Sequence, residues 1–370
     1  MGVVAVVGLG PMGRAALYYL IKHTNHEVWG YDKSSEAVNS ALSLGANAVK
    51  ADVMNDDAAR RIASNSDVVL TAVPQSIADS LVLKLHDYGA KVIDLIFLWK
   101  YDSGIAERIN NGPLVIPACG WAPGLTNLLA IAAASELDTV EELGIHVGGN
   151  PVNPRPPLYY ELLFSIESTI DEYVRPATIM INGEFKEVDP LSLIYPFRTW
   201  LIDGEFSEFY TDGLSTLIAT IPKHFKGIKM MYERTIRWSR HLEVMRILKD
   251  ISLLNNESLV KSLGSILKQG VEDFSLTVVE AKGTINGEPA RVAFEGIDYA
   301  SGGFTSMARL TGFTAAIVSD LVARGVVKGN GLLPIEEAYI MNKDVLRQVL
   351  NGLKAEGVKF MFTKTVTAPY

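Results

Sequence analysis

The first 32 residues constrain the fold of this chain more than any other stretch. An apolar run, Val3 to Val7, leads into the turn Gly8-Leu9-Gly10-Pro11-Met12-Gly13; a helical pattern follows, and a second short strand ends at Asp32. Strand, glycine turn, helix, strand and acid are the parts of a dinucleotide-binding βαβ unit. A glycine turn alone occurs in many folds, so the prediction depends on the agreement of all five parts. The alternative is a doubly wound domain that has lost its cofactor.

Each glycine of the turn has an expected physical role. Gly8 permits the tight turn out of the strand, Gly10 lets the backbone approach a pyrophosphate, and Gly13 lets the helix pack close to the sheet. The N-terminus of the following helix would present unpaired N–H groups and a positive dipole end to the phosphates. The turn therefore predicts a pyrophosphate site made by the backbone.

Asp32 sets the predicted choice of cofactor. Its carboxylate would accept hydrogen bonds from the adenosine ribose and repel a 2′-phosphate, so the sequence favours NAD over NADP. Lys33-Ser34 directly after it keeps NADP as the alternative. The predicted cofactor contacts are Gly8, Leu9, Gly10, Pro11, Met12, Gly13, Asp32, Asp52, Val53, Ala72, Val73, Pro74, Asp94 and Cys119.

Apolar runs typical of strands alternate with helical patterns over the first 120 residues. The expected strands cover residues 3–7, 27–31, 46–50, 67–73, 90–96 and 114–117. This alternation predicts a Rossmann-type, doubly wound parallel sheet with right-handed crossovers, an α/β fold. Ligands of such a sheet bind at the carboxyl ends of its strands, where the predicted cofactor contacts lie.

A second, α+β region with a largely antiparallel sheet is predicted after this sheet. Asn182-Gly183 and Asn286-Gly287 each separate two strand-like runs, which is a strong hairpin signal. Prolines make regular structure unexpected from Asn150 to Pro157. Near the C-terminus, small residues at helical spacing around Gly312 predict close packing against a sheet or another helix.

The composition excludes several classes of function. The formal net charge is −8 with no concentrated basic stretch, which argues against nucleic-acid binding. Cys119 is the single cysteine, so no internal disulfide forms and a reducing compartment is expected. No run of about 20 apolar residues would span a membrane, and the N-terminus lacks the features of a signal peptide. We expect a cytoplasmic protein with no membrane partner.

Few residues stand out for chemistry. The histidines are scattered and no metal-binding motif occurs, so no metal is expected. Cys119 is either a thiolate near the cofactor or a small buried hydrophobe. The turn around Trp121 either approaches the nicotinamide or only links two domains. Arg237 either clamps a substrate carboxylate or belongs to a solvated face with Arg240 and His241.

The whole chain resembles the saccharopine dehydrogenase and lysine 6-dehydrogenase group. The resemblance is carried by VVGLGPMG, CGWAPGLTN, DEYVRPATIMINGEF, FYTDGLSTL, TIRWSRH, EVMRIL and MARLTGFTAAIVSDLVARGVVKGNGLLP. It implies a Rossmann domain over residues 1–124, a substrate-binding and dimerisation domain over 125–303, and a segment over 304–370 that returns to the nucleotide domain. A homodimer is the expected assembly.

The motif around Trp121 favours the lysine branch of this group. Saccharopine reductases resemble GLDPG where this chain has Gly120-Trp121-Ala122-Pro123-Gly124, so the aspartate that helps hold saccharopine is replaced by Ala122. Saccharopine enzymes also tend to be longer. The arginine that contacts the substrate carboxylate in saccharopine reductases aligns with Arg237, which keeps this residue as the expected clamp.

The resemblance implies NAD-dependent oxidative deamination of the side-chain amine of L-lysine. A hydride leaves the carbon that carries the amine, and the imine is hydrolysed with loss of ammonia. The amine must be neutral, although its free pKa is about 10.4, so a base or a desolvated pocket is needed. The unranked catalytic candidates are Tyr160, Glu161, Asp212 and His241, and the substrate-binding candidates are Trp121, Thr211 and Arg237.

Two other functions remain open from the sequence. A saccharopine dehydrogenase would interconvert an imine between lysine and a 2-oxo acid, and three substrate carboxylates would need several inward arginines. A non-catalytic NAD-sensing or assembly protein would bind NAD but would not form NADH with an amine.

Overall fold

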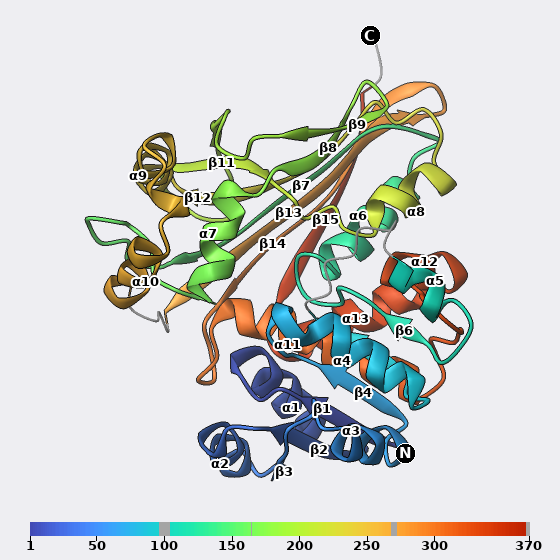
Figure 1. Cartoon of the computed structure of the whole chain (residues 1–370). Coiled ribbons are helices and arrows are strands. Elements are labelled where there is room, and N and C mark those ends of the chain that lie inside the picture. The colour runs from blue at the N-terminus through green and yellow to red at the C-terminus, as the bar shows by residue number, and fades with distance from the viewer. Residues whose placement is uncertain (96–103, 164, 268–271, 368–370) are drawn as a thin grey trace. The chain divides into compact units, whose positions relative to one another are not determined.

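The structure of the protein, a computed structural model, describes residues 1–95, 104–163, 165–267 and 272–367. This described chain divides into two compact units (Figure 1). Unit 1 comprises residues 1–128, 215–220 and 308–357, and unit 2 comprises residues 129–214, 221–307 and the residues from 358 onward. Unit 1 is thus assembled from three separate stretches of the chain.

Unit 1 is built on a parallel sheet with six strands among the described residues, in the order β3-β2-β1-β4-β5-β6. The strands are β1 (Val3–Val7), β2 (Glu27–Asp32), β3 (Asn47–Lys50), β4 (Val68–Thr71), β5 (Val92–Asp94) and β6 (Val115–Ile116). The order turns back between β1 and β4, the position at which doubly wound sheets bind their ligands. The predicted Rossmann-type fold is confirmed. Ile96, the end of the predicted fifth strand, lies outside the described residues.

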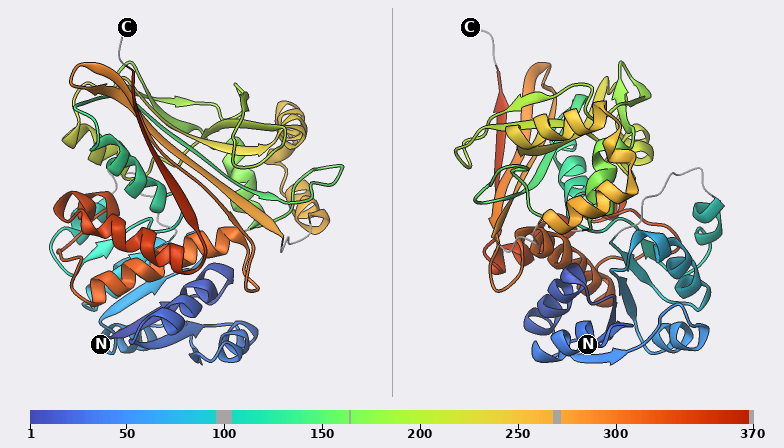
Figure 2. Two further views of the ribbon diagram at one scale, coloured as in Figure 1. Left: turned by 180° about the vertical axis from the view of Figure 1, so that it is seen from behind. Right: turned by 60° about the vertical axis from the view of Figure 1, so that its left-hand side comes forward.

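The two central strands of this sheet are buried on both faces. No side chain from Val4 to Val7 or from Val68 to Thr71 has exposed surface. Helices cover both faces (Figure 2), which is why these strands are continuously apolar instead of alternating. The helices are α1 (Pro11–His23), α2 (Ser35–Ser43), α3 (Asp56–Ser64), α4 (Gln75–Asp87), α5 (Gly104–Ile109), α12 (Ile335–Met341), α13 (Asp344–Ala355), most of α11 (Ser306–Ala323) and the start of α6 (Leu125–Ala134).

Helix α11 packs directly on α1 within unit 1. A Cβ added at Gly312 would lie 2.5 Å from the carbonyl oxygen of Met12, so only glycine allows this approach. The ring of Phe313 also meets that of Tyr19 at a centroid distance of 5.3 Å. The predicted close packing of the small-residue helix is confirmed, and its partner is α1.

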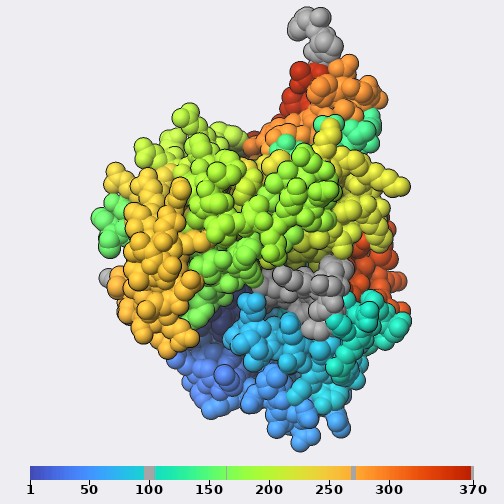
Figure 3. Space-filling model, turned by 45° about the horizontal axis from the view of Figure 1, so that its top comes forward, coloured from blue at the N-terminus to red at the C-terminus, as the bar shows by residue number. Residues whose placement is uncertain are grey.

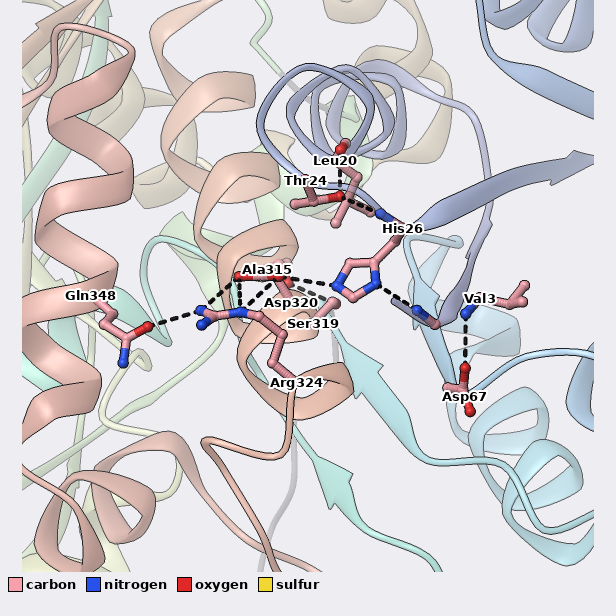
Figure 4. A network of polar contacts seen from close by, with 11 residues as sticks. Val3, Leu20, Thr24, His26, Asp67, Ala315, Ser319, Asp320, Arg324 and Gln348 are labelled. Atoms are coloured by element: carbon pink, nitrogen blue, oxygen red, sulfur yellow. Dashed lines mark hydrogen bonds and ion pairs between the residues drawn. The ribbon is translucent and has the colours of Figure 1, made fainter.

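A polar network also joins α11 and α13 to the start of the chain within unit 1 (Figure 4). His26 Nδ1 accepts the backbone N–H of Gly2 at 3.1 Å, so Nε2 carries the proton that it donates to Asp320 at 3.0 Å. Arg324 donates from Nε to both oxygens of Asp320, and from Nη2 to Gln348 at 2.8 Å. These bonds are one reason why residues 308–357 fold with the N-terminal sheet.

Unit 2 is built on a mixed sheet that has nine strands in the described chain. The path is β10-β11-β12-β7-β13-β14-β15, with β8 also paired to β12 and β9 to β8. The strands are β7 (Thr139–Pro151), β8 (Ala177–Ile181), β9 (Glu184–Val188), β10 (Tyr195–Phe197), β11 (Phe206–Thr211), β12 (Met230–Trp238), β13 (Asp273–Ile285), β14 (Glu288–Tyr299) and β15 (Lys359–Val366). Only β12 and β7 run parallel among these described pairs, which confirms the largely antiparallel second sheet.

Both predicted hairpins are present in unit 2. Asn182-Gly183 joins β8 to β9 with φ values of +53° and +81°, and Asn286-Gly287 joins β13 to β14 with +53° and +83°. Left-handed conformations at both positions match the twist of the flanking strands, and asparagine and glycine tolerate them best. The hairpin turns therefore follow from local sequence.

Two stretches of unit 2 differ from the sequence prediction. β7 includes Asn150 and Pro151, which were expected to be irregular; proline is tolerated as its last residue because the carbonyl still accepts, here from Trp238 Nε1 at 3.0 Å. The segment 304–370 divides after Gly357, because β15 pairs with β14 instead of joining unit 1.

Helices cover one face of the unit 2 sheet. They are α7 (Ile166–Val174), α9 (Ser239–Asp250), the short 3-10 helix η1 (Leu253–Asn255) and α10 (Glu257–Ile266), and α8 (Leu217–His224) begins in the unit 1 stretch. Figure 3 shows α9 and α10 forming part of the surface of unit 2. Beneath them lies a cluster of buried apolar residues, Ile170, Tyr173, Leu191, Phe209, Leu242, Met245, Leu254 and Leu263.

Candidate active site

The glycine turn of unit 1 has the close contacts that its sequence predicts. Gly8 has a φ of +91°, and a Cβ there would lie 2.3 Å from the carbonyl oxygen of Ala72 on the neighbouring strand connection. A Cβ at Gly13 would lie 1.8 Å from the carbonyl oxygen of Gly8. These distances are far below van der Waals contact, so both positions require glycine for the fold itself.

Gly10 differs from the other two glycines. It is the N-cap of α1, exposed, with no side-chain cap and no described atom within 4 Å of an added Cβ. Pro11 follows at the first helical position, and the first turn carries no acidic residue. The amides at this helix end therefore face space where an anion would be favoured by their dipoles. This arrangement fits a dinucleotide pyrophosphate.

Asp32 lies at the carboxyl end of β2, beside the turn. Its Oδ2 accepts the N–H of Leu9 at 2.7 Å and its Oδ1 accepts the N–H of Ser34 at 2.7 Å. Each carboxylate oxygen has a second lone pair, which leaves acceptors for ribose hydroxyls. The hydroxyl of Ser34 accepts the backbone N–H of Ala37 at the start of α2. Ser34 therefore serves as the N-cap of this helix.

The remaining predicted cofactor contacts fall into two groups. Leu9, Asp94 and Cys119 have no exposed surface, so their side chains are not accessible to a cofactor in this structure. Asp94 Oδ1 accepts from Thr71 Oγ1 at 2.5 Å, and burial raises the pKa of the Cys119 thiol, so this cysteine behaves as a small buried hydrophobe. The other predicted contacts keep some surface: Pro11, Met12, Asp52, Val53, Ala72, Val73 and Pro74.

Trp121 follows β6 in unit 1. Its turn is closed by a backbone bond from Gly120 to the carbonyl of Pro123 at 3.1 Å, and the indole is 5% exposed. The residue is thus held by unit 1, whereas the other predicted substrate contacts lie in unit 2.

Polar side chains line one face of β12 in unit 2. Because side chains alternate along a strand, Glu233, Thr235 and Arg237 point to the same face. Thr211 of β11 lies directly opposite Glu233. Arg237 is 1% exposed and Glu233 is 4% exposed, so both are buried between the sheet and its helices.

Arg237 is held by three different partners. Nη2 donates to Glu172 Oε2 at 2.6 Å, Nη1 donates to the carbonyl of Ile236 at 3.1 Å, and Nε donates to the hydroxyl of Tyr173 at 3.4 Å. The guanidinium also lies 5.1 Å from the ring centre of Tyr160. A carboxylate of the protein therefore already occupies the position at which the predicted clamp would hold the substrate.

His241 is locked in one protonation state. Its Nδ1 meets the carbonyl of Leu158 at 2.7 Å and must donate to it, so Nε2 accepts from the Tyr173 hydroxyl at 2.8 Å. Burial, with a contribution from Arg237, lowers the pKa of His241 to about 3. Because both ring nitrogens are engaged and the ring stays neutral, His241 is poorly suited to act as a base near neutral pH.

Tyr160 stacks on His241 at a centroid distance of 4.7 Å. Burial raises its pKa, and no described residue makes a hydrogen bond with its hydroxyl. Glu161, the neighbouring candidate, is half-buried and makes no hydrogen bond or ion pair with the described residues. The structure thus brings Tyr160 and His241 to Arg237, but not Glu161.

A second group of carboxylates lies near Glu172 on the same face. Glu233 Oε1 accepts from Thr211 Oγ1 at 3.2 Å, while Oε2 has no partner among the described residues. Burial raises the pKa of Glu233 to about 8, with Glu172 and Asp212 adding to the shift. Asp212 accepts from the N–H of Thr178 at 3.2 Å and lies 3.7 Å from Arg175 Nε.

Glu172, Tyr173 and Glu233 were missed by the sequence reasoning. A signal for Glu233 exists, since a charged residue two positions from Thr235 and four from Arg237 places a polar stripe on a buried strand face. Glu172 and Tyr173 have no such signal, because α7 contacts β12 only through the tertiary packing.

The described part of the chain holds no group of residues suited to a metal ion, and no described helix is long and apolar enough to cross a membrane.

Comparison with known proteins finds a family match for the N-terminal part of the sequence and another for the rest of it up to residue 358. Residues 120–358, more than half of the chain, match the saccharopine dehydrogenase C-terminal domain family, and residues 3–122 match the NAD-binding domain of semialdehyde dehydrogenases. These two matches confirm the predicted cofactor, NAD, and the predicted class of NAD-dependent oxidoreductase.

Similar proteins agree with this assignment. Over 268 residues the chain is 22% identical to the mitochondrial alpha-aminoadipic semialdehyde synthase of Rattus norvegicus, covering 69% of this chain and 29% of that protein. The chain thus spans less than a third of the length of this relative. The fold matches apo saccharopine dehydrogenase (L-Glu forming) from Saccharomyces cerevisiae with a TM-score of 0.82 at 16% identity over 100% of both chains.

A second solved structure extends the likeness of fold. The homospermidine synthase of Legionella pneumophila in complex with NAD matches with a TM-score of 0.67 at 12% identity, over 98% of this chain and 91% of that one. The glycine turn, the two sheets and the match over residues 120–358 lead to one conclusion: the chain belongs to the saccharopine dehydrogenase family, as an NAD-binding oxidoreductase.

Proposed function

We propose that the protein catalyses NAD-dependent oxidative deamination of the side-chain amine of L-lysine. The observation that supports this most strongly is the charge of the polar group in unit 2. Its described carboxyl groups are Asp171, Glu172, Asp212 and Glu233, and its described guanidinium groups are Arg175 and Arg237. An acid-rich group is suited to an ammonium ion and is poorly suited to a substrate with three carboxylates.

Arg175 is the more accessible of these two guanidinium groups for a substrate carboxylate. Its side chain is 30% exposed, while that of Arg237 is 2% exposed. Its Nη1 lies 3.2 Å from Asp171, and its Nε has no hydrogen-bond partner among the described residues. We propose that Arg175 takes over the role first assigned to Arg237, which instead organises the protein's own carboxylate.

The residues of unit 1 serve the cofactor in this proposal. The amides that follow Gly10 bind the pyrophosphate, and Asp32 accepts the ribose hydroxyls. NAD, when bound, supplies the acceptor for the hydride that leaves the substrate carbon. The residues of unit 2 hold the amine in its neutral form, which is needed because an ammonium ion has no lone pair to assist hydride loss.

The proposal is tested by measuring NADH formation and ammonia release with L-lysine, saccharopine, ornithine and carboxylated polyamines. We expect lysine to give equal amounts of NADH and ammonia. A preference for saccharopine, with 2-oxoglutarate and lysine as the products, would replace the proposal by the second candidate, which the likeness in fold to a saccharopine dehydrogenase supports.

We further propose a homodimer in the cytoplasm. The strand β15 exposes apolar side chains, with Met361 at 49%, Phe362 at 50% and Val366 at 46%, and a second copy would cover them. Light scattering at micromolar concentration is expected to give twice the mass of the chain, and a monomer would contradict the assembly. Fractionation of cells is the corresponding test of the compartment.

A further inference from the structure

Glu172 is the accessible member of the buried ion pair in unit 2. Its side chain is 25% exposed, whereas that of its partner Arg237 is 2% exposed. Oε2 accepts from Arg237 Nη2 at 2.6 Å, and no described residue donates to Oε1. The pair therefore presents one carboxylate oxygen to a ligand, and the guanidinium holds that carboxylate in place.

Arg237 itself is covered on several sides. Its three nitrogens donate to Glu172, Ile236 and Tyr173, and the ring of Tyr160 lies over the guanidinium. The hydrogen-bond chain continues from the Tyr173 hydroxyl to His241, whose ring is fixed by a backbone carbonyl. Such a fully engaged network resists rearrangement and gives Glu172 a fixed orientation.

Two buried polar groups beside this pair lack protein partners. The Tyr160 hydroxyl, in a residue that is 4% exposed, interacts electrostatically with Arg237 and Glu172 and has no hydrogen-bond partner in the described chain. Glu233 Oε2, also 4% exposed, is likewise without a described partner and interacts with Glu172. Unsatisfied buried polar atoms of this kind are uncommon, and a bound ligand or a water molecule would complete their hydrogen bonds.

We propose that Glu172 is the catalytic residue that binds the reacting amine of the substrate and removes its proton, with Arg237 as its positioning residue. This inference rests on the proposed function, which it deepens by naming the base. The earlier candidates fit this role less well: Asp212 has partners for both oxygens, His241 has partners for both nitrogens, and Tyr160 is a buried phenol.

The step balances as a simple proton transfer followed by oxidation of the substrate. The ammonium group R–CH₂–NH₃⁺ gives one proton to Glu172 Oε1 and becomes R–CH₂–NH₂. The C–H bond then breaks with its electron pair, the nicotinamide dinucleotide is reduced by that hydride, and the substrate becomes R–CH=NH₂⁺. Water adds to the carbon, and ammonium leaves with formation of the aldehyde. The proton on Glu172 returns to solvent.

Burial of Glu172 supports the role of base. It raises the pKa of this carboxyl, while Arg237 partly opposes the shift. A carboxylate whose pKa moves toward that of the amine accepts its proton more readily.

The first test compares Glu172→Gln with wild type in steady-state oxidation of L-lysine. We expect kcat/KM to fall by at least about 100-fold, the usual range for loss of a general base. Glutamine still accepts a hydrogen bond from Arg237, and circular dichroism checks that the variant is folded. Glu167→Gln, on the exposed first turn of the same helix α7, is the matched control and is expected to behave as wild type. A Glu172→Gln variant within about threefold of wild type would overturn the assignment.

The second test measures binding without catalysis. With NADH present, which cannot accept a hydride, calorimetry compares lysine with norleucine, which has the same chain but no side-chain amine. Wild type is expected to prefer lysine by about tenfold or more, and Glu172→Gln is expected to remove that preference. If Glu172→Gln still bound lysine about tenfold more tightly than norleucine, the role of Glu172 would be overturned.

The outcomes distinguish failure of the proposed function from failure of the proposed base. Failure of wild type to reduce NAD with lysine contradicts the proposed function, whatever Glu172 does. Activity of wild type together with full activity of Glu172→Gln contradicts only the assignment of the base. Arg237→Lys, which keeps the charge but not the planar fork, is expected to lower kcat more than it raises KM if the arginine acts by orienting Glu172.

Discussion

The glycine turn of unit 1 and the polar group of unit 2 are built from different materials. The turn offers backbone amides, and three glycines within six residues fix its shape. The polar group offers side chains from α7, β11, β12 and α9, and its central bond joins Arg237 to Glu172, 65 residues apart. A backbone site depends on local sterics, whereas a side-chain site depends on how several elements pack. Substitutions should therefore affect the two regions in different ways.

Removing Arg237 is expected to have the largest effect, because it leaves a buried carboxylate without its partner. Arg237→Ala should lower the free energy of unfolding by about 3–5 kcal/mol, the range seen when one member of a buried ion pair is removed. Chemical denaturation measures this change, and lysine oxidation should be lost at the same time.

Arg240→Ala provides the control for that experiment. Arg240 lies three residues away; its guanidinium donates to the hydroxyl of Tyr159 at 3.2 Å and lies 5.5 Å from the centre of the same ring. Little change in stability is expected. If Arg237→Ala and Arg240→Ala lowered the free energy of unfolding by the same amount, the buried ion pair of Arg237 would have no special role in stability.

Gly10→Ala should separate binding from folding in the glycine turn. A Cβ at this position meets no described atom, so the melting temperature should stay close to that of wild type. The added carbon occupies the approach of the pyrophosphate, and the Kd for NAD should rise by about tenfold or more, equivalent to about 1.4 kcal/mol.

Gly104→Ala is the matched control, since its Cβ would also meet no described atom and its φ is not left-handed. Titration calorimetry with NAD should show no change for it. Unchanged NAD affinity in Gly10→Ala would contradict the placement of the pyrophosphate at this helix end.

Asp32→Asn is expected to have a smaller effect that is specific to the cofactor. Asparagine has one acceptor oxygen, which can still accept from the backbone of Leu9 but not also from that of Ser34. The glycines should keep the shape of the turn, while the negative charge that repels a 2′-phosphate is lost. The ratio of NAD to NADP affinity should fall by about tenfold. A wild type that prefers NADP would contradict the role given to Asp32.

Glu233→Gln should leave NAD binding unchanged and show its effect on stability as a dependence on pH. Burial raises the pKa of Glu233 to about 8 in the folded protein, so folding favours the protonated form. The stability associated with this proton is fully present below about pH 4.5 and is lost as the pH rises through about 8. The melting temperature of the variant, relative to wild type, should therefore rise between pH 5 and pH 9. A difference that is constant over this range would show that Glu233 does not titrate there.

Much of the fold follows from local sequence. The βαβ unit, the parallel sheet and both Asn-Gly hairpins could be predicted because each depends on residues close together in the chain. The strand β15 could not, because nothing local distinguishes pairing with β14 from a place in unit 1. The same limit applies to Pro151, which the partner strands accept at the end of β7.

In the candidate site, too, some features follow from local sequence and others only from tertiary packing. The sequence by itself determined the glycine turn and Asp32, since the steric demands on Gly8 and Gly13 act over a few residues and one neighbouring strand. Only the tertiary structure decided that Arg237 holds Glu172 instead of standing free, and that His241 is neutral. These properties arise when α7 and α9 pack on β12. Burial then removes water from the charged groups, which form hydrogen bonds and ion pairs with the side chains that the packing places beside them.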